Sequence, residues 1–194
     1  MEIALSAAGS GVDVDVTLVR GMAAGDEAAL RQLYARHGRR LFAYAYRITG
    51  SAEVAEEVVQ ESLLAAWHGA GRFRGDGRAI AWLLGIVHRQ ALNATRRKQY
   101  PTVSLDDAAQ PAGDADPLDH AASAERDAAL GAALAELSVD HRAAIELVFY
   151  HGLSMAEAAQ VCGCPPGTIK SRLSYAKNHL RGILARAGLR REEL

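Results

Sequence analysis

The sequence has little cysteine and no hydrophobic run long enough to cross a membrane. Its two cysteines, Cys162 and Cys164, are separated by one residue, which is too close for an ordinary disulfide, so reduced thiols are expected. The longest apolar run, residues 79–87, is far shorter than the roughly 18 residues that a membrane-spanning helix needs. Glu2 stands where a signal peptide would carry positive charge. These features predict a cytoplasmic protein without direct membrane insertion.

The sequence also lacks strand-like alternation, internal repeats and any recognisable catalytic arrangement. No nucleophile–base pair, phosphate-binding loop or cluster of metal ligands can be identified, so we expect neither an enzyme nor a cofactor. Cys162, Cys164 and His151 are too few and too scattered for a zinc site, so no metal is expected. The cysteines leave a thiol-based redox protein as one alternative, and the expected fold is all-α.

The net charge of −1 conceals two basic segments. Residues 72–98 hold seven lysines and arginines against one acid, and residues 165–191 hold seven and no acid. Acidic residues gather elsewhere, in residues 53–61 and 106–119. A chain that is almost neutral overall can therefore present two surfaces that attract nucleic acid.

Apolar residues recur at three- and four-residue intervals in the first half of the chain, which predicts amphipathic helices. These helices are expected over about residues 26–50, 51–67 and 78–98, with a Gly- and Arg-rich loop at 69–77. Asp26 is suited to cap the first helix, and the second opens at Ser51. The small residues at the start of the chain cannot form a core, so residues 1–19 are expected to be disordered.

Residues 100–120 contain three prolines and five aspartates, with no lysine or arginine, and are expected to form an acidic linker. Helices are then expected near residues 121–137 and 138–150. The linker divides the chain into two small helical domains. They comprise residues 20–99 and 121–188, followed by a tail at 189–194.

The most specific motif follows, as two short helices joined by a tight turn. Ser154 and Glu157 have the spacing of a capping box, and Gly163 supplies a left-handed residue where the first helix ends. The second helix, residues 168–180, spaces its apolar residues to bury one face. Its other face carries cationic and hydroxyl side chains. Such a helix suits the major groove of DNA, where it contacts phosphates and base edges together.

Three motifs resemble those of bacterial sigma factors of the sigma-70 family. Residues 55–67 (AEEVVQESLLAAW) are similar to the family's polymerase-binding helix, and residues 82–98 to the promoter-reading helix after it. Residues 163–173 (GCPPGTIKSRL) are similar to its recognition motif. The resemblance covers roughly residues 20–185. Because only these two domains are present, the chain resembles the extracytoplasmic-function (ECF) group.

The resemblance implies that the first domain is sigma region 2 and the second is sigma region 4. The chain would bind core RNA polymerase, with region 2 on the clamp helices of the largest subunit and a further contact with the flap. The expected polymerase-binding residues are Glu57, Gln60, Glu61 and Leu64. Leu63 and Ala65 replace the usual aromatic residue and arginine, which thins this contact surface.

The resemblance also assigns the promoter contacts. Region 2 would open the −10 element and hold its unpaired bases, and region 4 would read the −35 element as duplex, with Arg172 as the base reader. The acidic linker would pass through the RNA exit path of the polymerase. Members of the group are commonly held inactive by an anti-sigma factor, so such a partner is expected. The −10 candidates are Arg72, Phe73, Arg74, His88, Arg89, Asn93, Arg96 and Arg97. The −35 candidates are Thr168, Lys170, Ser171, Arg172, Ser174, Tyr175 and Lys177.

Some of these residues keep a second interpretation. Phe73 fits either base stacking or simple anchoring of its loop, whereas Trp67 and Trp82 fit core packing better than insertion into DNA. Arg96 and Arg97 also fit a helix end that complements the helix dipole. For the whole chain, the alternative is a stand-alone helix-turn-helix activator whose first half senses a signal or dimerises. Binding to core polymerase distinguishes it from a sigma factor.

Overall fold

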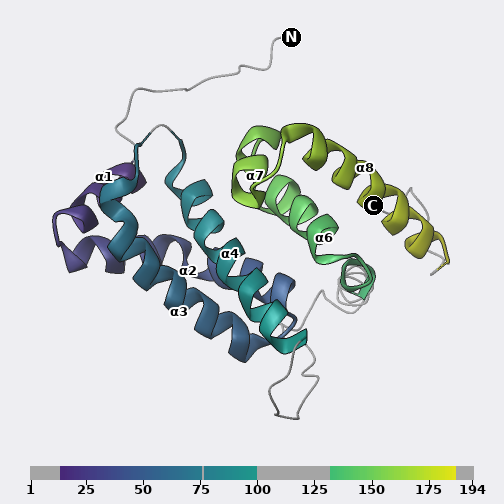
Figure 1. The fold of residues 1–194 in the computed structure, drawn as a ribbon, viewed down its shortest axis with the longest axis horizontal. Helices are drawn as coiled ribbons and strands as arrows, with labels where there is room; N and C mark the ends of the chain where they lie inside the picture. The colour runs from purple at the N-terminus through teal and green to yellow at the C-terminus, as the bar shows by residue number, and fades with distance from the viewer. Residues whose placement is uncertain (1–13, 76, 100–131, 187–194) are drawn as a thin grey trace, which may run out of the picture.

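The computed structural model describes residues 14–75, 77–99 and 132–186. Within these ranges the chain is helical and has no strand, which confirms the all-α prediction. Figure 1 shows a first lobe built from α1 to α4 and a second lobe built from α6 to α8. The acidic linker at 100–120, the tail at 189–194 and most of the helix expected at 121–137 lie outside the described residues, although residues 132–135 are helical.

The first lobe is a helical bundle in which α2 packs against both α3 and α4. Its caps are those that the sequence predicts. The Asp26 side chain accepts a hydrogen bond from the backbone of Ala28 at 2.8 Å, and Ser51 accepts one from Val54. Gly50 ends α2 in the left-handed conformation, with φ of 73°. The elements are α1 (Val14–Ala23), α2 (Glu27–Thr49), α3 (Ala52–Gly69), the 3-10 turn η1 (Ala70–Arg72) and α4 (Ala79–Gln99).

Helix α1 shows that the prediction of disorder as far as residue 19 is wrong, because the helix begins at Val14. Val19 and Met22, three residues apart, are buried in the core of the first lobe. Asp15 accepts a hydrogen bond from Nε of Arg36 at 2.7 Å and lies 2.7 Å from Nε2 of His37. A helix this short is unstable alone, so its order comes from packing against α2 rather than from local sequence.

The second lobe contains the predicted helix-turn-helix. Both hydrogen bonds of the capping box form: Oγ of Ser154 accepts from the backbone of Glu157 at 3.2 Å, and Oε2 of Glu157 accepts from the backbone of Ser154 at 2.8 Å. Gly163 ends α7 with φ of 63°. The helix expected at 138–150 changes from α to π geometry after Ile145. The elements are α6 (Val139–Ile145), the π-helical turn η2 (Glu146–Tyr150), α7 (Met155–Cys162) and α8 (Pro166–Arg186).

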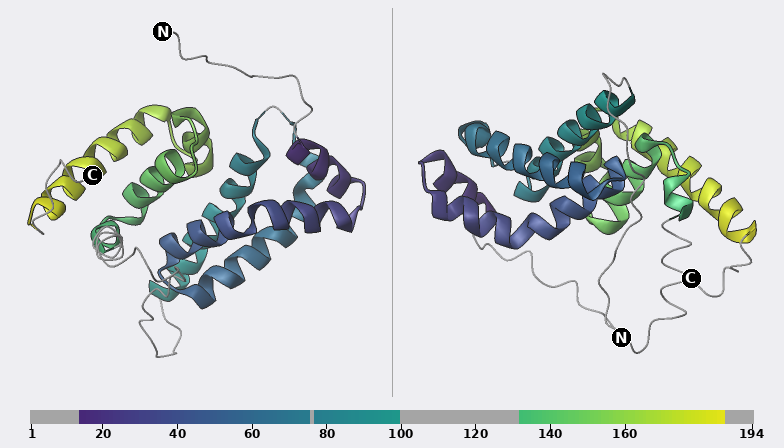
Figure 2. Two further views of the ribbon diagram at one scale, coloured as in Figure 1. Left: turned by 180° about the vertical axis from the view of Figure 1, so that it is seen from behind. Right: turned by 90° about the horizontal axis from the view of Figure 1, so that it is seen from below.

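The two lobes lie side by side, with α7 packed against α4 and α6 near α2 (Figures 1 and 2). The approach is close at Gly85, where an added Cβ would lie 3.9 Å from Cα of Val161. The first helix of the helix-turn-helix therefore rests on the helix expected to read the −10 element.

Candidate nucleic-acid and polymerase interfaces

Helix α3 presents one acidic face with an exposed leucine. Glu57, Gln60, Glu61 and Leu64 follow the i, i+3, i+4, i+7 spacing of a single helix face, and all four are exposed. Leu64 is 61% exposed, while the opposite side of α3 is buried in the first lobe. An apolar side chain displayed among acids suits a contact with a basic protein surface better than a contact with DNA.

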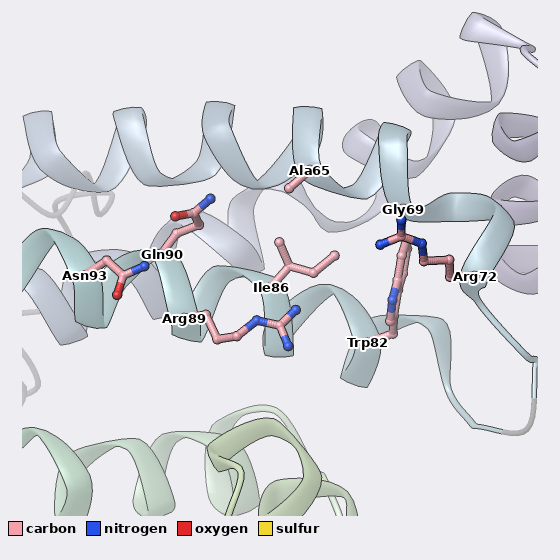
Figure 3. A pocket seen from close by; sticks show the side chains of 8 residues that line it. All are labelled: Ala65, Gly69, Arg72, Trp82, Ile86, Arg89, Gln90 and Asn93. Carbon is pink, nitrogen blue, oxygen red and sulfur yellow. The ribbon is translucent and has the colours of Figure 1, made fainter.

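A pocket of about 370 Å³ lies between α3 and α4 (Figure 3). The predicted −10 residues Arg72, Arg89 and Asn93 line it, so the structure brings them together. Ala65 and Gly69 form the α3 side, where small side chains leave room. Its full lining is Ala65, Gly69, Arg72, Trp82, Ile86, Arg89, Gln90 and Asn93.

Trp82 and Gln90 also line this pocket, although they are not among the predicted −10 residues. Gln90 lies next to Arg89 in the sequence and supplies an amide that can both donate and accept hydrogen bonds. Trp82 is half-buried and packs against the core of the first lobe. The sequence identifies it as a packing residue, and only the structure shows that it also lines this pocket.

Phe73 anchors its loop, which is one of its two predicted interpretations. Its ring lies 5.2 Å from the ring of Trp82 at an interplanar angle of 43°, and the side chain is half-buried against the core. Arg74, its neighbour, is exposed. The structure therefore places the loop's aromatic group inward and leaves an arginine outward.

His88 corrects the prediction of an exposed −10 contact. It is 3% exposed, and its Nδ1 lies 2.8 Å from the hydroxyl of Tyr44. Burial lowers the pKa of His88 to about 4, so at neutral pH it offers no positive charge to a phosphate. The pattern on α4 indicated a polar position, but the second lobe packs against this helix. Arg96 and Arg97, in the last turns of α4, are exposed as predicted.

The recognition helix α8 exposes most of the predicted −35 residues. Lys170, Ser171, Ser174, Tyr175 and Lys177 are exposed, whereas Thr168 is half-buried. The ring of Tyr175 stacks on His141 at 4.3 Å, and Nζ of Lys177 lies 4.8 Å from the centre of the Phe149 ring. Ile169, Leu173 and Ala176 form the buried face, as predicted.

Arg172 lies differently from its neighbours on α8. Its Nη2 donates to Oδ2 of Asp140 at 2.6 Å, and its Nη1 lies 3.8 Å from Sγ of Cys164. The side chain is only 19% exposed. The guanidinium thus ties α8 to α6 and to the turn before it. Asp140 is 32 residues away in the chain, so no local pattern could have indicated this pairing.

The cysteines do not carry the features of a redox centre. Neither forms a disulfide, and burial raises the pKa of Cys162 to about 12. The Cys162 thiol is therefore protonated at neutral pH, which makes it a poor nucleophile. Across the part of the chain that the structure describes, no three His, Cys, Asp or Glu side chains form a potential metal site. Nor does that part contain a helix both long and apolar enough to cross a membrane.

The two lobes thus offer different kinds of surface. The first carries an acidic face with an exposed leucine on α3 and a pocket lined by arginines between α3 and α4, and the second carries a helix-turn-helix with an exposed cationic helix. A helix-turn-helix together with such an acidic face is the combination expected of a DNA-binding protein that also binds a protein partner.

Comparison with known proteins identifies the family. Residues 33–100 match Sigma-70 region 2, and residues 127–180 match Sigma-70, region 4. The ECF RNA polymerase sigma factor SigL of Mycobacterium tuberculosis is 38% identical over 176 residues, which cover 89% of this chain and 98% of SigL. SigM of the same organism is 36% identical over 171 residues, which cover 88% of this chain and 84% of SigM. The chain belongs to the ECF group of the sigma-70 family, whose members are non-enzymatic factors of transcription initiation.

Solved structures share the arrangement of helices. The structure of CnrH in complex with the cytosolic domain of CnrY has a TM-score of 0.68 at 26% identity and covers 90% of this chain and 99% of that one. The sigma factor RpoE of Bartonella quintana, in complex with the anti-sigma factor NepR, has a TM-score of 0.65 at 31% identity. The match covers 80% of this chain and 96% of RpoE.

Proposed function

We propose that this sigma factor binds core RNA polymerase through α3 and directs it to promoters, reading the −10 element with the first lobe and the −35 element with α8. The observation that carries the proposal is the exposed face of Glu57, Gln60, Glu61 and Leu64, on the side of α3 away from its buried residues. Its chemistry fits the clamp helices of the largest subunit. The flap and the RNA exit path are the further polymerase contacts, for region 4 and the linker.

For the −10 element, the α3–α4 pocket would hold an unpaired base. Trp82 offers a ring at the wall, Gln90 and Asn93 offer amides for base edges, and Arg72 and Arg89 offer charge for the backbone. Arg74, Arg96 and Arg97 are exposed beyond the pocket and would contact phosphates. This combination of stacking, edge contacts and charge is what extraction of a base from the duplex requires.

For the −35 element, the exposed side of α8 would enter the major groove. Lys170 and Lys177 suit phosphates, and Ser171, Ser174 and Tyr175 suit base edges or sugars. Thr168, near the start of α8, would contact the backbone. Arg172 would have to release its hydrogen bond to Asp140 before its guanidinium could contact a base.

We also propose that an anti-sigma factor binds this chain. Support comes from the similarity to RpoE, whose solved structure is a complex with the anti-sigma factor NepR. The exposed Leu64 within an acidic face gives such a partner the same surface that core polymerase would use. Competition between the two is the expected form of control.

The test of polymerase binding is the double variant Gln60→Ala, Glu61→Ala. We expect core binding to weaken about tenfold or more, because both side chains lie in the middle of the proposed interface. Run-off transcription from the promoter of the protein's own operon should fall in parallel, while binding of the full-length variant to −35 duplex stays unchanged.

The matched control is Glu27→Ala, Gln32→Ala, which removes the same two residue types from an exposed part of α2. It should leave core binding unaltered. Equal loss of core binding and −35 binding in the α3 variant would show that this face is structural. Tight promoter binding by the parent protein without any effect on core polymerase would favour a stand-alone activator instead.

A further inference from the structure

The connection between α3 and α4 carries two of the proposed −10 contacts beside flexible glycines. We define the arginine loop as Arg72, Phe73, Arg74 and Gly75, with Gly71 just before it. Both arginines are exposed, and Arg72 also lines the pocket between α3 and α4. Glycine widens the range of conformations open to the backbone, so a loop of this composition fixes its side chains only if other elements hold it.

Phe73 fixes the start of the arginine loop. Its ring lies 5.2 Å from the ring of Trp82 on α4 and is half-buried against the core of the first lobe. The backbone of Phe73 is extended, with φ of −70° and ψ of 116°, and consecutive side chains of extended backbone point to opposite sides. The inward ring of Phe73 therefore turns Arg74 outward.

Helix α1 lies against the other end of the arginine loop (Figures 1 and 2). A Cβ built on Gly75 would lie 3.7 Å from Cγ1 of Val16 and 3.7 Å from Nη2 of Arg20. These two residues are four apart, so they share one face of α1. Gly75 itself has φ of 74°, in the left-handed region that favours glycine. Helix α1 also packs against η1, which ends at Arg72.

Helix α1 is itself tied to α2 at both of its ends. At its start, Asp15 accepts a hydrogen bond from Nε of Arg36 and lies 2.7 Å from Nε2 of His37. At its other end, the backbone N–H of Asp26 donates to the carbonyl of Gly21 at 3.0 Å. Because both ends are tied, α1 gives the arginine loop a rigid support.

Two faces of α1 thus have different partners. Val19 and Met22 are buried in the core of the first lobe, whereas Val16 and Arg20 lie next to Gly75. Core packing accounts for the first pair. It does not account for the second pair, because Val16 is only half-buried and Arg20 is exposed. Their place beside a loop that carries −10 candidates indicates a role in recognition.

Resting on the proposed function, we propose that α1 braces the arginine loop, and that Val16 and Arg20 are positioning residues for the −10 element. Neither residue has to touch a base. By restricting Gly75, they reduce the conformational freedom that Arg72 and Arg74 lose when unpaired DNA binds. A loop held in one geometry favours the bases that fit it over those that do not. The brace therefore adds selectivity to contacts that charge alone would leave unselective.

The test removes the apolar part of the brace in the full-length chain. Val16→Ala deletes the methyl groups next to Gly75 without changing any charge, and it leaves the anchors of α1 on α2 in place. The readout is initiation by core polymerase on the promoter of the protein's own operon and on single-base variants of its −10 element. We expect the ratio between parental and altered −10 elements to fall about three- to tenfold. Core binding and the corresponding ratio for −35 variants should stay unchanged.

Val14→Ala is the matched control, because Val14 belongs to the same helix and is 54% exposed. It should keep the parental selectivity, as should Val16→Ile, which retains a branched apolar side chain. Adding Arg20→Ala to Val16→Ala removes the rest of the brace and should lower the −10 ratio further. Adding Arg39→Ala, at an exposed position of α2, should not.

Hydrogen exchange of the free full-length chain tests the brace without polymerase. Amides of residues 70–75 should exchange faster in Val16→Ala than in Val14→Ala, because the loop opens more easily once its support is reduced. Amides of α3 should exchange alike in the two variants.

Three results would overturn the brace. The first is equal exchange of the loop amides in Val16→Ala and Val14→Ala. The second is a −10 ratio in Val16→Ala equal to that of the parent. The third is a uniform loss of initiation on all promoters together with weaker core binding, which is what a merely structural role of Val16 would give. Failure of the proposed function looks different, because the parent chain would then not initiate with core polymerase.

Discussion

Arg172 stands on the recognition helix at a position where a cation suits DNA, yet Asp140 and Cys164 hold its guanidinium within the second lobe. Lys170, two residues earlier, is exposed and points away from the core. Two cations on one helix thus have different surroundings. One connects helices of the lobe, and the other is available to a ligand.

We predict that Arg172→Ala and Asp140→Ala, combined in a double-mutant cycle, show a coupling energy of about 1 kcal/mol, since Asp140 is 53% exposed and solvent screens the pair. Thermal unfolding of the variants measures this coupling energy. Arg172→Ala should weaken binding to all −35 sequences alike, because the whole helix loses its anchor.

Lys170→Ala is the matched comparison. It should leave the melting temperature unchanged while reducing the salt slope of DNA binding by about 1, as loss of one phosphate contact does. Selective loss at a single base pair in Arg172→Ala, with unchanged thermal stability, would instead make Arg172 the base reader.

At the scale of the element, α1 shows how a short helix gains order from its neighbours. Burial raises the pKa of Asp15, but the hydrogen bonds from His37 and Arg36 outweigh it and hold the pKa below its ordinary value. The pKa of Asp15 is lower in the folded chain than in the unfolded chain. Its contribution to the stability of the folded chain is therefore present above the unfolded pKa of 3.8 and is lost as the pH falls below that value. The anchor of α1 is therefore intact at neutral pH.

Asp15→Asn should cost roughly 1–2 kcal/mol of unfolding free energy at pH 7, since the partly buried anchor loses its charge. Hydrogen exchange of α1 amides should accelerate more than that of α3 amides. The control Glu27→Gln disrupts a pair with Arg31 that is 71% and 77% exposed, so little change is expected. Unaltered exchange in α1 after Asp15→Asn would show that its apolar face alone holds it.

At the scale of the whole molecule, titratable groups buried where the two lobes meet link the stability of the folded chain to pH. Burial raises the pKa of Glu146 to about 7 despite Arg47 and Arg142, so its contribution to the stability of the folded chain is full below about pH 4.5 and is lost as the pH rises through 7. Burial lowers the pKa of His88 and of His151 to about 4. The contribution of the two histidines to the stability of the folded chain is present above pH 6.5 and is lost as the pH falls toward 4.

Two histidines oppose one glutamate between pH 6.5 and 4.5, so the folded chain should lose stability as the pH falls, with a limiting net slope of about 1.4 kcal/mol per pH unit. Charged groups of both lobes act on the two histidines: Asp140, Arg172 and Arg89 on His88, and Arg40 and Arg47 on His151. We predict a lower melting temperature at pH 5 than at pH 7. Glu146→Gln should steepen the change, and an unchanged melting temperature in both chains would contradict the prediction.

The features that could be predicted from sequence are those whose partners lie within a few residues. The caps at Asp26, Ser51 and Ser154 and the left-handed Gly163 depend on bonds within four residues, and each forms as expected. The apolar periodicity of α2, α3, α4 and α8 likewise identifies their buried faces, and the motifs on α3 and α7–α8 identify the family.

The sequence by itself determined the helices, their polar faces and the family, because capping and periodicity are local properties of the chain. Only the tertiary structure decided that α1 is ordered, that Arg172 pairs with Asp140 and that His88 is buried. These outcomes depend on partners 21 to 44 residues away, such as Asp15 for Arg36 and Tyr44 for His88. Helical periodicity shows which side of a helix is polar, but the packing of another lobe decides whether that side meets solvent, DNA or protein.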